Sequence, residues 1–336
     1  MNYIIFGGTG FIGTHLAKLI KAQQRDAVIY NLDIVRQGDP LPTVKDYKPA
    51  LCDGEEHPAF FVECDVRNEI KVPFTPTSDD VIFNFAAVHR TPGHPDHDYF
   101  ETNMRGAENV CAFAEKHGIK KMVFTSSIAP YGAAEDLKEE STLPTPNTPY
   151  GISKLVAENI HKTWQARSAD RSLLIVRPGV VFGRGENGNF TRLYWGMRGR
   201  KFAYPGRKDT IKACIYVKEL VCFMMWYLEQ QKTGVETYNC TFEPAYTIEH
   251  ICETIKKVTN LNRTTLLIPS WILMPAAFLA KCLGSPMGIC PARVKKLMIS
   301  TNISGKKLAN CGYPFKYTFE QAIDDWFADN NRKGLQ

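Results

Sequence analysis

The stretch GGTGFIG, residues 7–13, limits the fold of this chain more than any other feature of its sequence. It directly follows an apolar β-type run, YIIF (3–6), and opens a helical pattern. A tight strand-to-helix turn requires glycine, and a dinucleotide pyrophosphate requires bare backbone beside a helix N-terminus. The context therefore predicts a nucleotide-binding turn. The residues expected to bind there are Gly7, Gly10, Phe11, Ile12 and Gly13.

Short apolar runs of β type alternate with helical patterns through the first half of the chain. Apolar residues recur with helical spacing over 12–23, 105–118 and 153–168. Strands separated by helices in this way form a parallel sheet that helices cover on both faces. The expected fold class is therefore α/β, a Rossmann-type doubly wound parallel sheet. The strand candidates are 3–6, 27–32, 60–63, 81–87, 121–127 and 173–178.

An acidic residue, Asp33, follows the second predicted strand, about twenty residues after the glycine turn. A carboxylate at this place accepts a hydrogen bond from the adenosine ribose 2′-hydroxyl and repels a 2′-phosphate. The expected cofactor is therefore NAD rather than NADP. Asp65 and Val66, in CDVRN after the third strand, are expected to contact the adenine edge.

The regular alternation ends after Pro178, where glycine, arginine and aromatic residues become more frequent. We therefore expect an NAD-binding Rossmann domain over 1–178. A smaller C-terminal substrate-binding lobe is expected over 179–336, with one strand, 235–240, returning to the sheet.

Charge is distributed unevenly along the chain, although its net value is only +6. Residues 1–150 contain 14 Lys and Arg against 21 Asp and Glu, a net charge of −7. Residues 151–336 contain 27 against 14, a net charge of +13. A basic second half favours a phosphorylated ligand or an anionic membrane surface. Nucleic acid is not expected as a partner, because no nucleic-acid-binding motif occurs in the sequence.

The ten cysteines are scattered and form no CxxC pair, which argues against a zinc site or a disulfide framework. The N-terminal sequence lacks the basic region and cleavage site of a signal peptide. We therefore expect a cytoplasmic protein without a bound metal.

The sequence NTPYGISK places Tyr150 and Lys154 four residues apart at the start of a predicted helix. Side chains at this spacing lie on the same helical face. An ammonium about 4 Å from the phenol contributes roughly 4 kcal/mol at a surface-like dielectric, or about three pKa units. The pair therefore predicts a tyrosine pKa low enough for acid–base chemistry near neutral pH.

Five motifs, in this order and spacing, resemble the extended short-chain dehydrogenase/reductase family, the NAD-dependent epimerases and dehydratases of sugar nucleotides. The motifs are GGTGFIG, CDVR, NFAA, TSSIAPYG and YGISK, with further likeness over 177–190 and 312–322. The resemblance implies that Tyr150 is the acid–base residue and that Lys154 binds the nicotinamide ribose and lowers the tyrosine pKa. It also implies that Ser127 hydrogen-bonds the reacting sugar oxygen. The cofactor contacts that it adds are Ala86, Ala87 and Asn103.

Within this family, the set Ser127, Tyr150 and Lys154, without an acidic pair after the serine, favours a C4 epimerase. In that reaction Tyr150 takes the sugar 4-OH proton while a hydride passes from C4 to NAD, and the hydride returns to the opposite face. A dehydratase places an acidic pair directly after the catalytic hydroxyl, whereas Ile128 and Ala129 follow Ser127 here. Two alternatives stay open, a 4-keto-sugar reductase that consumes NADPH and a non-catalytic dinucleotide-sensing protein. Asp33 argues against the first, and retention of the tyrosine and lysine argues against the second.

A closer resemblance is to bacterial 4-epimerases that act on N-acetylglucosamine linked to undecaprenyl diphosphate, and to UDP-sugar 4-epimerases. It is based on AAVHR (86–90), on 187–189 and on 292–323. It implies a diphosphate-linked sugar substrate, with either a nucleotide or a polyprenyl carrier, for surface-glycan synthesis. We also expect a homodimer.

The resemblance implies substrate contacts in the basic second half. Lys212 matches a basic position that contacts the distal phosphate, and Asn189 matches a position that touches the ligand diphosphate. Further candidates, each equally well explained as surface charge or structure, are His89, Arg90, Arg207, Lys208 and Lys296.

The segment 266–280, LLIPSWILMPAAFLA, contains no charged residue and two prolines. It is shorter than the roughly 20 residues that a membrane-spanning helix needs. One interpretation is a buried helix of the small lobe. The other is an interfacial segment that touches lipid, flanked by the basic residues Lys281, Arg293, Lys295 and Lys296.

Overall fold

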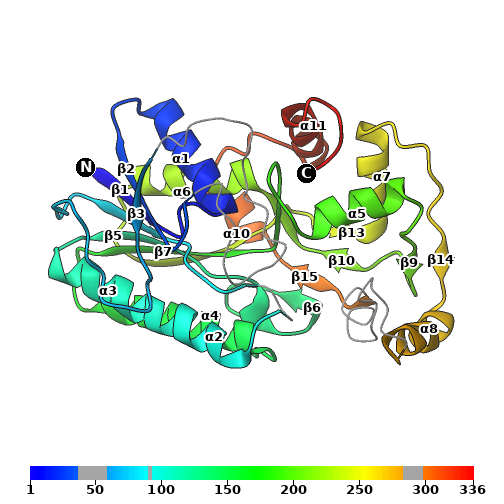
Figure 1. Cartoon of the computed structure of the whole chain (residues 1–336), viewed down its shortest axis with the longest axis horizontal. Coiled ribbons are helices and arrows are strands. Elements are labelled where there is room, and N and C mark those ends of the chain that lie inside the picture. The colour runs from blue at the N-terminus through cyan, green and yellow to red at the C-terminus, as the bar shows by residue number, and fades with distance from the viewer. Residues whose placement is uncertain (37–58, 90–92, 283–297) are drawn as a thin grey trace.

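A seven-stranded parallel sheet forms the centre of the computed structural model, which describes residues 1–36, 59–89, 93–282 and 298–336 (Figure 1). Strand β1 lies between β4 and β2, so the order reverses direction at β1. In sheet order the strands are β12 (Gly234–Cys240), β7 (Ser172–Pro178), β5 (Lys121–Thr125), β4 (Val81–Asn84), β1 (Asn2–Phe6), β2 (Val28–Asp33) and β3 (Phe60–Glu63).

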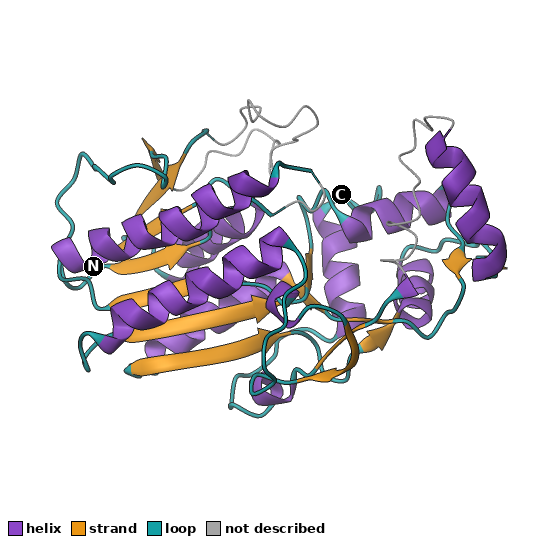
Figure 2. Cartoon of the chain, turned by 90° about the horizontal axis from the view of Figure 1, so that it is seen from below, coloured by secondary structure: helices purple, strands orange, loops and turns teal. Residues whose placement is uncertain are grey.

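Helices cover both faces of this sheet, as Figure 1 shows. Helices α1 (Phe11–Gln23) and α6 (Val217–Glu229) pack on one face around Leu16, Ile20 and Leu220. Helices α3 (Gly106–Lys116) and α4 (Pro149–Ala166) pack on the other, and from below they lie along the strands (Figure 2). A strand covered on both sides has no polar face, and β7, SLLIVRP, is accordingly buried throughout. The predicted Rossmann-type, doubly wound α/β fold is confirmed.

Two strands are shorter than the sequence pattern predicts. The candidates 81–87 and 121–127 end at Asn84 and Thr125. The last residue of β4 pairs with Phe6, where β1 turns into the glycine loop. Neither β4 nor the apolar residues after it can extend the sheet beyond that point. These residues instead form loops at its carboxyl edge.

Elements after Pro178 contribute to both parts of the molecule. Strand β12 pairs in parallel with β7 at the edge of the large sheet, in the region where 235–240 was expected to return. Helices α6 and α10 (Lys306–Ala309) pack on the large sheet as well. The other elements form a lobe whose core is rich in aromatic residues, including Phe182, Phe319 and Trp326. The division at residue 178 into two domains stays a prediction.

The small lobe consists of short strands and helices. A four-stranded sheet has the order β13 (Tyr246–Thr247), β10 (Ile211–Lys212), β15 (Thr301–Ile303) and β6 (Ala134–Lys138). Two strand pairs are β11 (Cys214–Tyr216) with β8 (Val180–Phe182), and β14 (Leu267–Ile268) with β9 (Tyr204–Pro205). The helices are α5 (Asn189–Arg198), α7 (Ile248–Val258), α8 (Ser270–Cys282) and α11 (Phe319–Asp329).

The apolar segment 266–280 forms β14 and most of α8, at one end of the small lobe (Figure 1). Five of its large side chains face solvent, among them Trp271 at 75% and Leu266 at 68% exposure, whereas Ile268, Leu273 and Met274 are half-buried. The buried-helix interpretation is therefore wrong for the exposed side chains. Over the described ranges, none of the helices has the length and apolarity needed to cross a bilayer.

Candidate active site

The glycine turn lies beside the loop that follows β4, where the strand order reverses. Gly7 has φ +73°, and a Cβ there would lie 2.7 Å from the Ala86 backbone nitrogen. Only glycine therefore fits between these two loops. The expected cofactor residues Ala86 and Ala87 are thus next to the turn, at the position where open α/β sheets bind their ligands.

The start of α1 fits a pyrophosphate. Gly10 precedes the helix, which has no side-chain cap and no acidic residue in its first turn. Its first N–H groups, from Phe11, Ile12 and Gly13, therefore offer positive partial charge to an anion. A Cβ at Gly13 would come within 2.8 Å of Gly8 backbone atoms, so glycine also permits the helix to approach the turn.

Asp33 lies at the end of β2, against the glycine turn. Its Oδ2 accepts hydrogen bonds from Thr9 Oγ1 at 2.7 Å and Thr9 N at 3.2 Å, and its Oδ1 accepts one from Ile34 N at 2.8 Å. Burial raises the pKa of Asp33, and these hydrogen bonds oppose that shift. The carboxylate is thus fixed at the edge of the turn, which suits recognition of a ribose hydroxyl.

The residues expected at the adenine edge follow β3. Asp65 forms an ion pair with Arg67 at 2.6 Å, and hydrogen bonds from Arg67 lower the pKa of Asp65. Val66 packs against the start of α3, where a Cβ at Gly106 would lie 2.8 Å from its Cγ2. Both residues are near the other cofactor candidates, but the Asp65 carboxylate is already paired.

Asn103 connects the loop after β4 to helix α4. It lies in a π-helical turn, η1 (Glu101–Arg105), between α2 (Asp96–Phe100) and α3. Its side chain accepts a hydrogen bond from Val88 N at 2.9 Å and donates to Val88 O at 3.0 Å and Ser153 Oγ at 2.9 Å. All three hydrogen bonds of the Asn103 side chain are therefore made to other protein groups. Asn103 holds the loop after β4 in place beside the glycine turn.

The three predicted catalytic residues meet where α4 begins. Thr148 caps this helix by accepting a hydrogen bond from Gly151 N at 3.1 Å. A Cβ at Gly151 would lie 2.7 Å from Ala129 O, so the helix start packs directly on the loop after β5. Ser127, in that loop, accepts a hydrogen bond from Ala129 N at 3.1 Å, and its side chain lowers the pKa of Tyr150.

Burial has the largest effect on the pKa values of Tyr150 and Lys154. It raises the pKa of Tyr150 to about 12, although the Ser127 hydrogen bond lowers it. Burial also lowers the pKa of Lys154 to about 7, with the charge of Glu158 opposing that shift. The Lys154 ammonium donates to Thr125 O at 2.8 Å and lies 4.8 Å from the centre of the Phe124 ring. The predicted lowering of the tyrosine pKa by Lys154 is therefore absent in this structure, because the ammonium is directed elsewhere.

The substrate candidates lie in or beside the small lobe. Arg207 pairs with Glu135 of β6 at 2.9 Å and donates to Ser300 Oγ at 2.7 Å. Lys212 donates to Ile299 O at 2.7 Å, so both basic residues flank the segment before β15. His89 is exposed in the loop after β4, whereas Arg90 and Lys296 lie outside the described residues.

Asn189, the remaining substrate candidate, is the exposed first residue of α5. The carboxylate of Glu186 already accepts hydrogen bonds from the first backbone N–H groups of that helix, including Thr191 N at 2.9 Å. Burial raises the pKa of Glu186, which these hydrogen bonds oppose. The Asn189 side chain can therefore contact a ligand diphosphate, whereas the first N–H groups of α5 are already bonded to Glu186.

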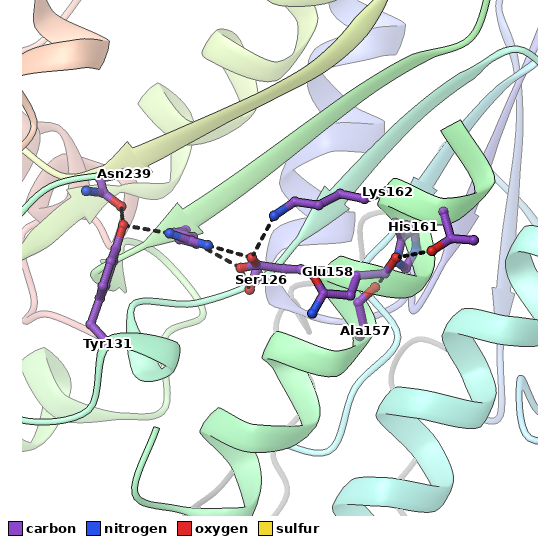
Figure 3. Close-up of polar contacts among 10 residues, drawn as sticks. Ser126, Tyr131, Ala157, Glu158, His161, Lys162 and Asn239 are labelled. Carbon is purple, nitrogen blue, oxygen red and sulfur yellow. Dashed lines mark hydrogen bonds and ion pairs between the residues drawn. The ribbon is translucent and has the colours of Figure 1, made fainter. Parts of the chain in front are cut away.

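Sequence reasoning missed a buried polar network behind the site, drawn in Figure 3. It contains Glu158 of α4 and Arg177 of β7, whose side chains are 0% and 4% exposed. Ser126, Tyr131 and Asn239 complete the network through hydrogen bonds. Only the spacing of Glu158 could have pointed to this network in the sequence. Glu158 follows Lys154 by four residues and Tyr150 by eight, so the three share one helical face.

Metal binding finds no support in the described parts of the chain. Within these ranges no cluster of three His, Cys, Asp or Glu side chains is placed to hold an ion. The described cysteines are free, and most are buried.

Comparison with known proteins identifies relatives for most of the chain. A model of the NAD dependent epimerase/dehydratase family matches residues 3–241. The N-acetyl-alpha-D-glucosaminyl-diphospho-ditrans,octacis-undecaprenol 4-epimerase of Escherichia coli O157:H7 is 28% identical over 96% of this chain and 93% of its own length. The UDP-glucose 4-epimerase of Yersinia enterocolitica is 24% identical over 78% and 84%. The structure of the Thermus thermophilus UDP-glucose 4-epimerase complex with NAD has a TM-score of 0.72 at 20% identity, over 99% of both chains.

The lowered pKa of Lys154 predicts a pH-dependent contribution to stability. Between pH 7 and about 10 the unfolded chain binds the lysine proton and the folded protein does not, so stability rises with pH. Lys154→Met should remove this contribution, worth at most about 1.4 kcal/mol per pH unit. Urea unfolding from pH 7 to 10 measures the difference, with Lys71→Met, at an exposed lysine away from this network, as control. A difference between wild type and Lys154→Met that stays constant with pH would contradict the assignment.

Proposed function

Because the chain belongs to the NAD dependent epimerase/dehydratase family, we propose that it is an NAD-dependent C4 epimerase of a diphosphate-linked sugar. Its reaction runs through a 4-keto intermediate. The relatives named above include 4-epimerases of a UDP-sugar and of an undecaprenyl-linked sugar. Their full-length similarity supports an isomerase rather than an unrelated activity on the same fold.

One observation supports the proposal most directly: Ser127, which lowers the pKa of Tyr150, lies in the loop on which the first turn of α4 packs, one turn before the buried Lys154. These groups follow β5 and begin α4, at the same sheet edge as the glycine turn. A hydroxyl and a phenol in contact can share the proton of a sugar hydroxyl. The adjoining glycine turn would hold the pyrophosphate of NAD at Gly10–Gly13, and Asp33 its adenosine ribose.

The chain's own residues divide the acid–base work. Tyr150, as phenolate, accepts the proton of the sugar 4-OH and, as phenol, returns it to the 4-keto oxygen. Ser127 holds that oxygen, and its hydrogen bond favours the phenolate because it lowers the tyrosine pKa. NAD held at the glycine turn would supply the hydride chemistry at C4. Rotation of the keto sugar between the two transfers inverts C4.

Other chemistries of this fold are less well supported. A dehydratase needs an acid beside the catalytic hydroxyl, but Ile128 packs toward Tyr131 and Ala134 in a small apolar cluster. A 4-keto-sugar reductase would use the same three residues with NADPH, which Asp33 disfavours. A non-catalytic sensor would have no need for the complete set of Ser127, Tyr150 and Lys154.

For the carrier, we propose a polyprenyl diphosphate reached at an anionic membrane surface. An exposed apolar patch, formed by Leu266, Leu267, Trp271, Ile272 and Phe278, supports this proposal. Exposed aromatic and aliphatic side chains of this kind suit the apolar side of a lipid interface. The basic residues Lys256, Lys257 and Arg263 line a surface hollow together with Glu253 at the C-terminal end of α7, which lies away from α8 in Figure 1, so they do not extend this patch. Arg293, Lys295 and Lys296 lie outside the described residues, and the homodimer and cytoplasmic location stay predictions.

Substitution of the proposed base tests the reaction. Tyr150→Phe should lower turnover by at least a hundredfold, because general acid–base catalysis contributes about 10²–10⁴-fold. NAD binding should persist, and Tyr317→Phe, in the small lobe, should retain activity. The assay follows C4 epimers by NMR with UDP-N-acetylglucosamine, UDP-glucose and lipid-linked N-acetylglucosamine. More than a tenth of wild-type activity in Tyr150→Phe would exclude this tyrosine as the base.

Cofactor choice tests the role of Asp33. A 2′-phosphate about 4 Å from this carboxylate costs roughly 4 kcal/mol at intermediate dielectric, so NAD should bind about a thousandfold more tightly than NADP. Asp33→Asn should reduce that preference, since it removes the charge while preserving the size. Titration calorimetry measures both affinities. Equal binding of the two cofactors to the wild type would favour the reductase.

Liposome flotation tests the membrane surface. The protein should float with phosphatidylglycerol vesicles at low salt and separate at high salt, since each basic residue near the surface contributes about 1 kcal/mol and salt screens it. Trp271→Ser should weaken flotation, whereas Leu143→Ser, which replaces a distant exposed leucine, should not. If no protein floats even at low salt, a soluble nucleotide sugar becomes the better substrate.

A further inference from the structure

We propose that Glu158 and Arg177 are positioning residues for this site, because their ion pair fixes the loop that carries Ser127 and places the Glu158 carboxylate one helical turn from Lys154. The kinetic part of this inference rests on the proposed function. The part that concerns Lys154 does not, since it can be measured without turnover.

The ion pair joins helix α4 to strand β7. Arg177 Nε donates to Glu158 Oε1 at 2.8 Å, and Arg177 Nη2 donates to Glu158 Oε2 at 2.6 Å. Two parallel hydrogen bonds of this kind fix the relative orientation of both side chains. Replacing such a buried pair by apolar residues is often neutral or stabilising, so stability alone does not account for it.

Both ends of the catalytic loop are attached to this pair (Figure 3). At one end, Ser126 Oγ donates to Glu158 Oε1 at 2.6 Å. At the other, the Tyr131 hydroxyl accepts from Arg177 Nη1 at 2.7 Å and donates to Asn239 Oδ1 at 2.9 Å. The guanidinium also lies 4.9 Å from the Tyr131 ring centre. Ser127 is enclosed between these two attachments, so its contact with Tyr150 depends on them.

The same carboxylate acts on Lys154, one helical turn before it. Of the charges around this ammonium, that of Glu158 raises the lysine pKa and opposes the effect of burial. The other titratable groups packed around this part of α4 are Tyr99 of α2, Tyr150, His161 and Lys162 of α4, and Arg177 of β7.

His161 adds no charge near neutral pH. Burial lowers its pKa to about 4, its Nδ1 donates to Ala157 O at 2.7 Å, and its ring stacks on Phe124. Without the charge of Glu158, Lys154 and Arg177 would be buried cations with no carboxylate between them. Such a lysine gives up its proton.

The charge of Lys154 is measured directly by NMR of protein labelled at lysine Cε. Lys154→Met identifies the resonance. In Glu158→Gln the titration midpoint of Lys154 should fall by about 1–3 pH units, the usual effect of losing one nearby opposite charge. Glu158→Asp, which restores the charge, should return the midpoint towards the wild-type value.

Glu219→Gln is the matched control. Glu219 is equally buried, and its carboxylate accepts hydrogen bonds from Tyr313 Oη, Lys316 N and Tyr317 N at 2.5–2.6 Å, away from α4. Its substitution should destabilise the protein without moving the Lys154 titration. An unchanged midpoint in folded Glu158→Gln, or an equal fall in Glu219→Gln, would overturn the inference about charge.

Two milder variants test the loop and remain informative if Glu158→Gln does not fold. Ser126→Ala and Tyr131→Phe each remove one attachment and leave the ion pair intact. Each should lower kcat by tenfold to a hundredfold, as about 1 Å of misplacement does, with KM and the Lys154 titration little changed. Wild-type kcat in both would overturn the positioning role. If the wild-type protein converts none of the sugars, the proposed function fails, while the Lys154 titration still decides the charge.

Discussion

Parallel strands deliver their carboxyl ends to one edge of a sheet, and the site of this protein depends on that constraint. The glycine turn follows β1, Asp33 ends β2, Ala86 follows β4, and Ser127 follows β5. Because the strand order reverses beside β1, the loops after β1 and β4 approach so closely that only glycine fits at position 7. The sheet backbone thereby brings four separate segments together, so their approach does not depend on a flexible side chain.

Helix α4 adds the groups that the strands cannot provide. Its first turn presents Tyr150, whose ring lies against Tyr99 of α2, and its second and third turns present the buried side chains of Lys154 and Glu158. Burial on this face shifts the pKa of the phenol upwards and that of the ammonium downwards, so both groups are driven towards their neutral forms. Two different groups oppose these shifts: the Glu158 carboxylate one turn deeper raises the pKa of Lys154, and Ser127 lowers that of Tyr150.

Much of this arrangement could be predicted from the sequence, because it depends on local patterns. Alternating periodicity and the strand–glycine–helix turn were sufficient for the fold class. The Glu158–Arg177 pair could not be predicted, since it joins a helix to a strand and its burial depends on tertiary packing. The π-helical turn around Asn103 and the direction of the Lys154 ammonium depend on packing as well. Apolar composition was misleading for 266–280, because an uncharged run indicates burial only if another element covers it.

The small lobe constrains how a diphosphate can be held. A helix N-terminus would normally attract it, but Glu186 already occupies the first N–H groups of α5. Arg207 is likewise paired with Glu135, although both are partly exposed, where an ion pair stabilises by no more than about 1 kcal/mol. A dianionic ligand can replace so weak a partner far more easily than it can displace a buried, multiply bonded carboxylate. Under the proposed function, side chains around β10 are therefore better placed than the α5 dipole to bind the diphosphate. Exchange of Glu135 for substrate at Arg207 would couple ligand binding to β6, the strand that follows the catalytic loop.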